Sequence, residues 1–174
     1  MNIQVVTSQD AAKELDGLLW RILWKPIGLP RDVRQQFRVA GEQLELVARA
    51  RGQIIGGLVV VWTGKDEVEL CHLAVSPNDQ NQGIGRRLVT ALIEMVAIRG
   101  CRRIHTIARN TSSGFFQRLG FRKAPGAAPE HPVFKKHGIL FELMERDVEP
   151  AGACDALPAH DAGRWASAME RGNE

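Results

Sequence analysis

Two glycines separated by a single residue, Gly83 and Gly85, give the sequence its clearest chemical signal. They follow a strand-like run that ends near Val75, and an amphipathic helical pattern begins directly after them. Glycine permits positive φ and lets the backbone approach a ligand closely. The first turn of a helix has several unpaired N–H groups, which together with the helix dipole form an anion site. The pattern therefore indicates a turn that binds a negatively charged group such as a diphosphate.

Two arginines, Arg86 and Arg87, fall in the same first helical turn. A cation at this position is disfavoured by about 0.3–1 kcal/mol, and a bound diphosphate would reverse that penalty. Glycine-rich strand-to-helix turns are also common where no ligand binds, and exposed arginines occur by chance. These residues alone therefore leave two readings open, an anion site and plain packing.

The elements that must position this turn follow from the spacing of the apolar residues. A strand is expected at 68–75 and a helix at 84–99, which ends at Gly100. The other expected elements are strands at 2–6, 44–50, 54–62, 103–108 and 139–148, short helices at 32–37 and 112–119, an apolar-faced helix through Leu15 to Leu23, and a loop at 125–137. This order predicts an α/β (α+β) fold with a mixed, mostly antiparallel sheet and helices on both of its faces.

Composition narrows the class of protein. The chain has 174 residues, 44% hydrophobic and 25% charged, with a net charge of +3. No dense basic run is present, so nucleic acid is not an expected partner. The longest apolar stretch, 54–62, is too short for a membrane span, the start lacks a signal-peptide pattern, and the three cysteines have no metal-site spacing. We expect a cytoplasmic protein without a metal, with one domain at 1–148 and an Ala/Gly/Pro-rich tail at 149–174.

Two motifs resemble those of a known superfamily. Gln80-x-x-Gly83-x-Gly85, preceded by the run from Leu73 to Pro77, is similar to the acetyl-CoA motif of the GNAT N-acetyltransferases. The segment 116–121, Phe-Gln-Arg-Leu-Gly-Phe, resembles that family's next motif, in the right order and at the right spacing. The resemblance covers about residues 1–148. A dinucleotide-binding motif fits less well, because the glycine pattern is too short and a meander precedes the turn.

The resemblance implies a set of cofactor contacts. In this family the pantetheine arm of acetyl-CoA pairs with the strand before the glycine turn, and the pyrophosphate rests on the amides of the turn. An asparagine and an aromatic residue further along the chain contact the cofactor. Carried onto this sequence, the expected contacts are Leu73, Ala74, Val75, Asn81, Gln82, Gly83, Ile84, Gly85, Arg86, Asn110 and Phe116.

The resemblance also implies direct attack of a primary amine on the acetyl thioester. The backbone amide of Leu73 would polarise the thioester carbonyl, as an oxyanion hole does. Glu69 is the expected general base, and strand alternation places it on one face with Cys71 and Leu73. Glu67 is the second candidate. His72 would face the opposite way, as a packing residue whose near-neutral pKa keeps it open as a base.

The chain departs from the family at the residue that protonates the leaving thiolate. Many members use a tyrosine, but this chain has none, and Phe116 stands at the matching position. Solvent or the hydroxyl of Thr111, Ser112 or Ser113 would have to supply the proton. The alternative reading is therefore a non-catalytic acyl-CoA-binding regulator on the same fold.

The acceptor is expected to meet the loop 25–30, the loop 125–137, and the basic cluster of Arg31, Arg34 and Arg38. This cluster favours a small amine that carries a carboxylate, such as an amino acid, while a protein amine and a homodimer are left open. Arg109 could bind the carboxylate of the substrate or could be a surface charge.

Overall fold

The structure, a computed structural model, describes residues 1–151. Most of the expected tail at 149–174 lies outside the described residues. The strands are β1 (Asn2–Val5), β2 (Gln43–Ala50), β3 (Gln53–Trp62), β4 (Glu67–Val75), β5 (Arg103–Arg109), β6 (Arg122–Lys123) and β7 (Phe141–Asp147). The helices are α1 (Gln9–Leu19), α2 (Val33–Gln36), α3 (Ile84–Ile98), α4 (Ser113–Arg118) and α5 (Pro132–Lys136), with a π-helical turn at Trp20–Trp24 and 3₁₀ turns at Lys25–Ile27 and Pro77–Asp79.

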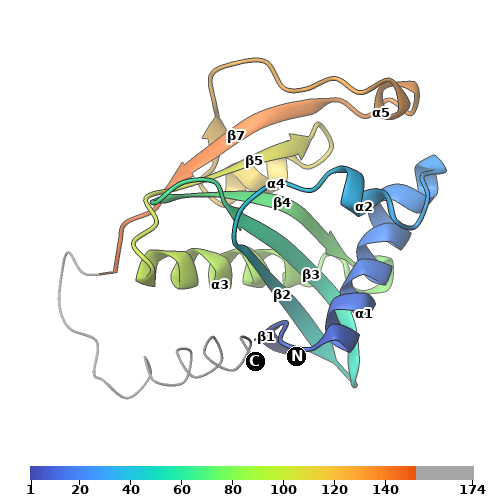
Figure 1. Ribbon diagram of the computed structural model, residues 1–174, viewed down its shortest axis with the longest axis horizontal. Coiled ribbons are helices and arrows are strands. Elements are labelled where there is room, and N and C mark those ends of the chain that lie inside the picture. The colour runs from blue at the N-terminus through green and yellow to red at the C-terminus, as the bar shows by residue number, and fades with distance from the viewer. Residues whose placement is uncertain (152–174) are drawn as a thin grey trace.

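The strands form one seven-stranded sheet in the order β1-β2-β3-β4-β5-β7-β6 (Figure 1). Every neighbouring pair is antiparallel except β4 and β5, which run parallel. The crossover that makes this pair parallel is the segment containing the glycine turn and α3. The predicted mixed, mostly antiparallel sheet with helices on both faces is confirmed.

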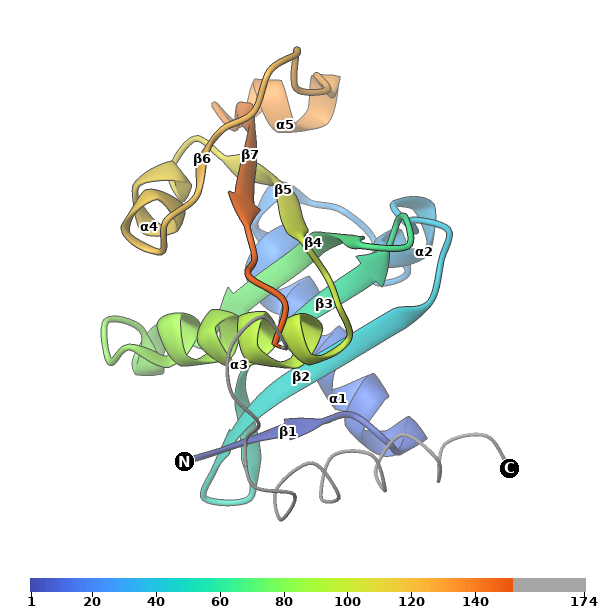
Figure 2. The same cartoon turned by 90° about the vertical axis from the view of Figure 1, so that its left-hand side faces the viewer.

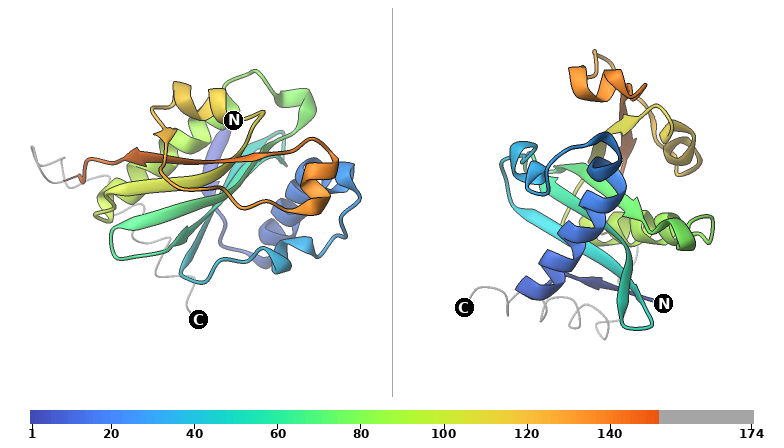
Figure 3. Two further views of the ribbon diagram at one scale, coloured as in Figure 1. Left: turned by 90° about the horizontal axis from the view of Figure 1, so that it is seen from above. Right: turned by 90° about the vertical axis from the view of Figure 1, so that its right-hand side faces the viewer.

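Two hydrophobic cores lie on opposite faces of the sheet. The α3 core contains Leu88, Leu92 and Val96 of α3, packed against Leu58 and other strand residues. The α1 core is built by α1 with the turn that follows it. It contains Leu15, Leu18, Leu19, Trp24, Ile27, Val33, Val47, Ile54, Val59, Ala74 and Phe134. Figures 2 and 3 show α3 and α1 crossing the two faces of the same strands. β4 is therefore packed on both of its faces, against the α3 core on one side and the α1 core on the other.

The structure differs from the sequence expectation in the segment that leads into β7. α5 lies inside the expected loop 125–137, and the last strand begins at Phe141 rather than at residue 139. Pro132 starts this helix at a position where its missing N–H costs nothing. A helix of five residues is too short to show apolar periodicity. Its Phe134 is nevertheless buried and belongs to the α1 core.

No helix among residues 1–151 is both long and apolar enough to cross a membrane. The longest, α3, has 15 residues.

Candidate functional site

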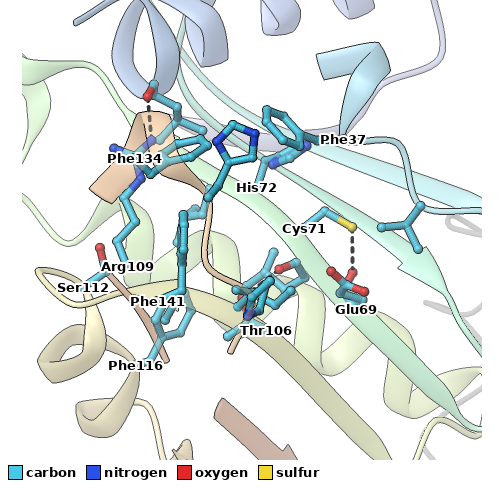
Figure 4. Close-up of a pocket in the computed structure, with 18 of the residues that line it drawn as sticks. Phe37, Glu69, Cys71, His72, Thr106, Arg109, Ser112, Phe116, Phe134 and Phe141 are labelled. Atoms are coloured by element: carbon cyan, nitrogen blue, oxygen red, sulfur yellow. Dashed lines mark hydrogen bonds between the residues drawn. The ribbon is translucent and has the colours of Figure 1, made fainter. Parts of the chain in front are cut away.

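The cleft between β4 and β5 is the candidate site. The two strands pair only through Glu67↔Arg103, Val68↔Ile104 and Glu69↔His105, and then diverge (Figure 1). The edge of β4 after Glu69 therefore has no ladder partner on this side, and a cavity of about 370 Å³ opens between the strands. Its walls include Leu23, Trp24, Phe37, Glu69, Cys71, His72, Leu73, Thr106, Arg109, Ser112, Phe115, Phe116, Glu130, His131, Phe134 and Phe141 (Figure 4).

A β-bulge in β4 corrects the expected alternation of side chains. On β3, Val59 pairs with His72 and the next residue pairs with Leu70, so Cys71 has no partner. Such an extra residue shifts the period-2 pattern by one position. Leu70 and Leu73 consequently both join the α3 core. The expectation that Glu69 and Leu73 share a face, and that His72 faces away from Glu69, is therefore wrong.

Glu69 lines the floor of the cavity, where β4 and β5 part. Its side chain is 16% exposed and its Oε2 lies 3.5 Å from Nε2 of His105 on the neighbouring strand. The other imidazole nitrogen, Nδ1, lies 3.4 Å from Oε1 of Glu67, but it is buried and makes no hydrogen bond among the described residues. Glu67 is more exposed and does not line the cavity. The structure therefore separates the two candidate bases by their access to the cavity.

The carboxylate of Glu69, aided by that of Glu67, raises the pKa of His105 above its ordinary value against the opposing effect of burial. A raised folded-state pKa adds stability that is fully present below the unfolded value of about 6.5 and is lost as pH rises through the folded value. We therefore expect His105→Gln to lower the free energy of unfolding more at pH 5.5 than at pH 9. Urea unfolding at both pH values measures this. An equal loss at both would show that the imidazolium has no carboxylate partner in the folded protein.

His72 is a neutral packing residue at physiological pH. It lies on the α1 side of β4, where its ring meets Trp24 edge-on with centroids 5.0 Å apart. Burial lowers the pKa of His72 to about 4, and the positive charge of Arg34 acts in the same direction. A group with so low a pKa is a weak base near neutrality. Although His72 lines the cavity, its environment makes it a poorer candidate base than its ordinary pKa would suggest.

Cys71 also lines the cavity, and its thiol is held in the neutral form. Burial, with the nearby carboxylate of Glu69, raises the pKa of Cys71 to about 12. A thiol that stays protonated is neither a nucleophile nor a metal ligand. We expect Cys71→Ala to change kcat by less than about threefold. Steady-state kinetics tests this, and rapid iodoacetamide labelling of the wild-type residue at pH 7.5, read by mass spectrometry, would contradict it.

The glycine turn has the backbone geometry expected of an anion site. Gly83 is the N-cap of α3 with φ of 77°, and Asn81 has φ of 61°. Gln80 donates from Nε2 to the carbonyl of Val75 at 3.0 Å, which ties the turn to the end of β4. Within residues 1–151, the backbone N–H groups from 81 to 86 donate to no protein acceptor, and the first helical bond runs from Arg87 to Gly83. These amides remain available to a ligand.

The two aromatic residues of α4 connect the turn with the cavity. Phe116 is 5% exposed, lines the cavity and meets Phe121 edge-on. Phe115 also lines the cavity, and a Cβ added at Gly85 would lie 3.3 Å from its Cζ. Sequence reasoning missed Phe115, although its place beside an expected cofactor residue was a signal. Glycine at position 85 therefore leaves room for the ring of Phe115, which lies beside the glycine turn and also lines the cavity.

Asn110 lies away from the cavity. It is exposed, and its side chain bridges to the start of β7: Oδ1 accepts from the N–H of Leu140 at 3.3 Å, and Nδ2 donates to the carbonyl of Gly138 at 3.5 Å. Its amide is thus engaged in holding the chain between β5 and β7. The other expected cofactor residues lie along β4, in the turn, or on α4.

The expected basic cluster is partly neutralised. Arg34 pairs with Asp16 and Glu45, and these carboxylates raise its pKa. The pairs lie in a second hollow of about 270 Å³, which Arg31 and Arg38 also line. Arg34 is therefore not free to bind an acceptor, and the structure does not bring it into the main cavity. In the described part of the chain, no group of three or more His, Cys, Asp or Glu side chains is arranged to hold a metal ion.

Comparison with known proteins gives consistent matches. The family model of the acetyltransferase (GNAT) domain matches residues 42–123. The uncharacterized N-acetyltransferase YjhQ of Escherichia coli K12 is 27% identical over 118 residues, which are 62% of this chain and 63% of the relative. The uncharacterized N-acetyltransferase CT2212 of Chlorobaculum tepidum is 32% identical over 77 residues, 44% of this chain and 48% of the relative. The chain thus matches less than two thirds of the length of these curated relatives, 63% of one and 48% of the other.

A solved acetyltransferase structure has a similar fold. A crystal structure of an aminoglycoside 6'-N-acetyltransferase complexed with coenzyme A superposes with a TM-score of 0.70 at 18% identity, covering 86% of this chain and 98% of that one. At this identity the likeness concerns the fold alone. Together these matches support a GNAT superfamily N-acetyltransferase, with the family model covering residues 42–123 of the 174.

Proposed function

We propose that the protein is an acetyl-CoA-dependent N-acetyltransferase that acts on a small primary amine, such as an amino acid. The observation that carries the proposal is the row of backbone N–H groups at 81–86. Within residues 1–151 they donate to no protein acceptor, and Gly85 lies next to Phe115, a ring that lines the cavity. Such amides at a helix N-terminus suit the pyrophosphate of a nucleotide cofactor. The family match, and the coenzyme A named with one fold relative, indicate which nucleotide.

The pantetheine arm would lie along the unpaired edge of β4, at Leu73, Ala74 and Val75. The pyrophosphate would rest on the amides of Asn81, Gln82, Gly83, Ile84, Gly85 and Arg86. Phe116 and its neighbour Phe115 would cover the arm from α4, since both rings line the cavity. Asn110 has less support as a cofactor contact, because its side chain bonds to the segment before β7.

In the reaction, the nitrogen of the acceptor amine attacks the thioester carbonyl, a C–N bond forms, and the C–S bond breaks to release the CoA thiolate. Glu69 would take the proton that the amine loses, directly or through water. The amide of Leu73, two residues after the bulge, would donate to the carbonyl oxygen as negative charge grows on it.

The thiolate needs little help to leave. A thiol of pKa about 8.5 is a tolerable leaving group, so solvent can protonate it. Of the three hydroxyls near the aromatic motif, Ser112 lines the cavity, whereas Thr111 is exposed and Ser113 donates to the carbonyl of Asn110 at 3.3 Å. Ser112 is therefore the side chain best placed to protonate the thiolate.

The function is tested by two measurements. Calorimetry should show CoA binding, with CoA but not ATP or NAD as a competitor of acetyl-CoA. A thiol-release assay over amino acids, polyamines and aminoglycosides should show acceptor-dependent turnover above the background hydrolysis of acetyl-CoA. If calorimetry shows no heat of CoA binding, the assignment of acetyl-CoA as the cofactor is wrong. Tight binding with no turnover on any amine would instead favour the non-catalytic acyl-CoA-binding regulator, which the lack of any tyrosine supports.

A further inference from the structure

One cation in the cavity is not used by the reaction described above. Arg109, at the end of β5, is half-buried and lines the cavity, and within residues 1–151 it forms no ion pair. Other arginines on the sheet, such as Arg49 and Arg122, pair with carboxylates. A charge removed from water without a partner is costly, so an unpaired one that borders a cavity points to a ligand of opposite charge.

The guanidinium of Arg109 is held in place by two contacts. It donates from Nη2 to the carbonyl of Leu23 at 2.5 Å, and it lies over the ring of Phe134 at 5.8 Å from the centroid (Figure 4). The carbonyl engages one of its five N–H donors, which leaves the other donors for a ligand. Glu130, another acid that lines the cavity, pairs with Lys135 at 3.0 Å and does not neutralise this charge.

The position of Arg109 in the sheet places it across the cleft from the proposed reaction centre. β4 and β5 are parallel, with Glu69 opposite His105. Arg109 lies four residues after His105 on β5. The same distance along β4 from Glu69, with the extra residue of the bulge counted, reaches the segment 72–74. The thioester is proposed to lie against that segment, so an acceptor bound between the two strands would lie within reach of both the acetyl group and the guanidinium.

The wall beside Arg109 is aromatic. Phe134 lies 5.2 Å from Phe141 and 5.8 Å from Phe37, measured between ring centroids, and His131 lies 5.5 Å from Phe134. All four rings line the cavity. A ligand that meets this wall must offer an apolar or aromatic surface, because a strongly hydrated group would lose its water there without replacement.

We propose that Arg109 binds the carboxylate of the acceptor and that the wall of Phe37, Phe134 and Phe141 receives its apolar side chain. The acceptor is then an apolar or aromatic amino acid, or a close analogue with both groups. Arg109 is a specificity-determining residue, and polyamines and aminoglycosides are disfavoured because their second positive charge would approach the guanidinium. This inference rests on the proposed function and narrows its substrate class.

The test compares matched ligands and matched variants. L-phenylalanine and its carboxamide differ only at the carboxylate, and each is assayed by thiol release and by calorimetry on the acetyl-CoA- or CoA-loaded protein. The variants are Arg109→Gln, Arg109→Lys and, as a control for the loss of one surface charge, Arg118→Gln on the exposed end of α4. We expect Arg109→Gln to lower the acid-to-amide ratio of kcat/KM at least about tenfold, mainly through KM, because an arginine–carboxylate pair is lost. Arg109→Lys should retain part of the preference, and Arg118→Gln all of it.

The outcomes separate the inference from the function. Turnover of amines without any preference for the acid, or an acid-to-amide ratio that Arg109→Gln leaves unchanged, overturns the inference and leaves the acetyltransferase assignment standing. Binding of the acid that depends on Arg109, without turnover of any amine, supports the carboxylate site and overturns the function instead. Thermal melting and the CoA affinity of each variant show that a lost preference does not come from misfolding.

Discussion

Replacing Glu69 with glutamine is expected to lower kcat for acetyl transfer about 100- to 10,000-fold, the range that a positioned general base contributes. The substitution keeps the shape of the side chain and removes only its ability to accept a proton. Glu69 lines the cavity at the point where β4 and β5 separate, whereas residues 81–86, whose amides would hold the pyrophosphate, do not line it. The dissociation constant of CoA should therefore change little, and single-turnover kinetics with saturating acetyl-CoA measures the chemical step directly.

The matched control is Glu67→Gln. Glu67 contacts the same imidazole, His105, and carries the same charge, but it does not line the cavity. We expect less than about a fivefold change in kcat for this variant, because a base must come within hydrogen-bond reach of the amine. Raising the pH should partly restore Glu69→Gln, since more of the amine is then deprotonated in solution. A larger loss in Glu67→Gln than in Glu69→Gln would transfer the role of base to Glu67.

Much of the architecture could be predicted because the signals are local. The apolar runs at 44–50 and 54–62 and the helical spacing after Gly85 became β2, β3 and α3 with small shifts of their ends. The free amides of the glycine turn also follow from local rules, since any helix start leaves donors unpaired. The residues that form the turn are close together in the sequence, between the end of β4 and the start of α3, so their pattern can be recognised without the structure.

The interior of the site could not be predicted in the same way, because it depends on register and on distant segments. The bulge at Cys71 is one extra residue, and strand alternation assumes that no such residue exists. The bulge moves the side chains that follow Cys71 to the opposite faces of the sheet. Strand alternation therefore places Leu73 and His72 on the wrong faces relative to Glu69. The partner of Arg109, the carbonyl of Leu23, is 86 residues away in the chain. No spacing rule brings these two residues together.

The short ladder between β4 and β5 explains why this sheet has a cleft. A parallel pair that continued along the full length of β4 and β5 would satisfy the edge of both strands and leave nothing for a ligand to bind. Here the ladder ends after three pairs, and Thr106 satisfies the carbonyl of Leu70 with a buried 2.7 Å hydrogen bond. The unpaired backbone beyond that bond adds polar groups to a cavity whose lining is mostly apolar. A ligand with amide groups, such as a pantetheine arm, is the kind that would pair with it.

The amides before α3 give the last prediction, which tests the cofactor site without relying on turnover. Arg86→Pro removes one of the free N–H groups while proline remains tolerated in a first helical turn, and Gly85 before it has no Cβ to clash with the ring. Arg86→Ala removes the same exposed side chain but keeps the N–H, so the difference between the two variants isolates the amide.

We expect CoA to bind Arg86→Pro about 10- to 100-fold more weakly than Arg86→Ala, because a hydrogen bond to a charged group contributes about 1.5–3 kcal/mol. Isothermal titration calorimetry at a fixed ionic strength measures both dissociation constants, and circular dichroism shows that α3 persists in each variant. Dephospho-CoA, which keeps the pyrophosphate, should show the same difference between the variants. Equal affinities in the two variants would mean that the pyrophosphate does not lie on this row of amides, and the cofactor would then have to be held by side chains such as Arg87.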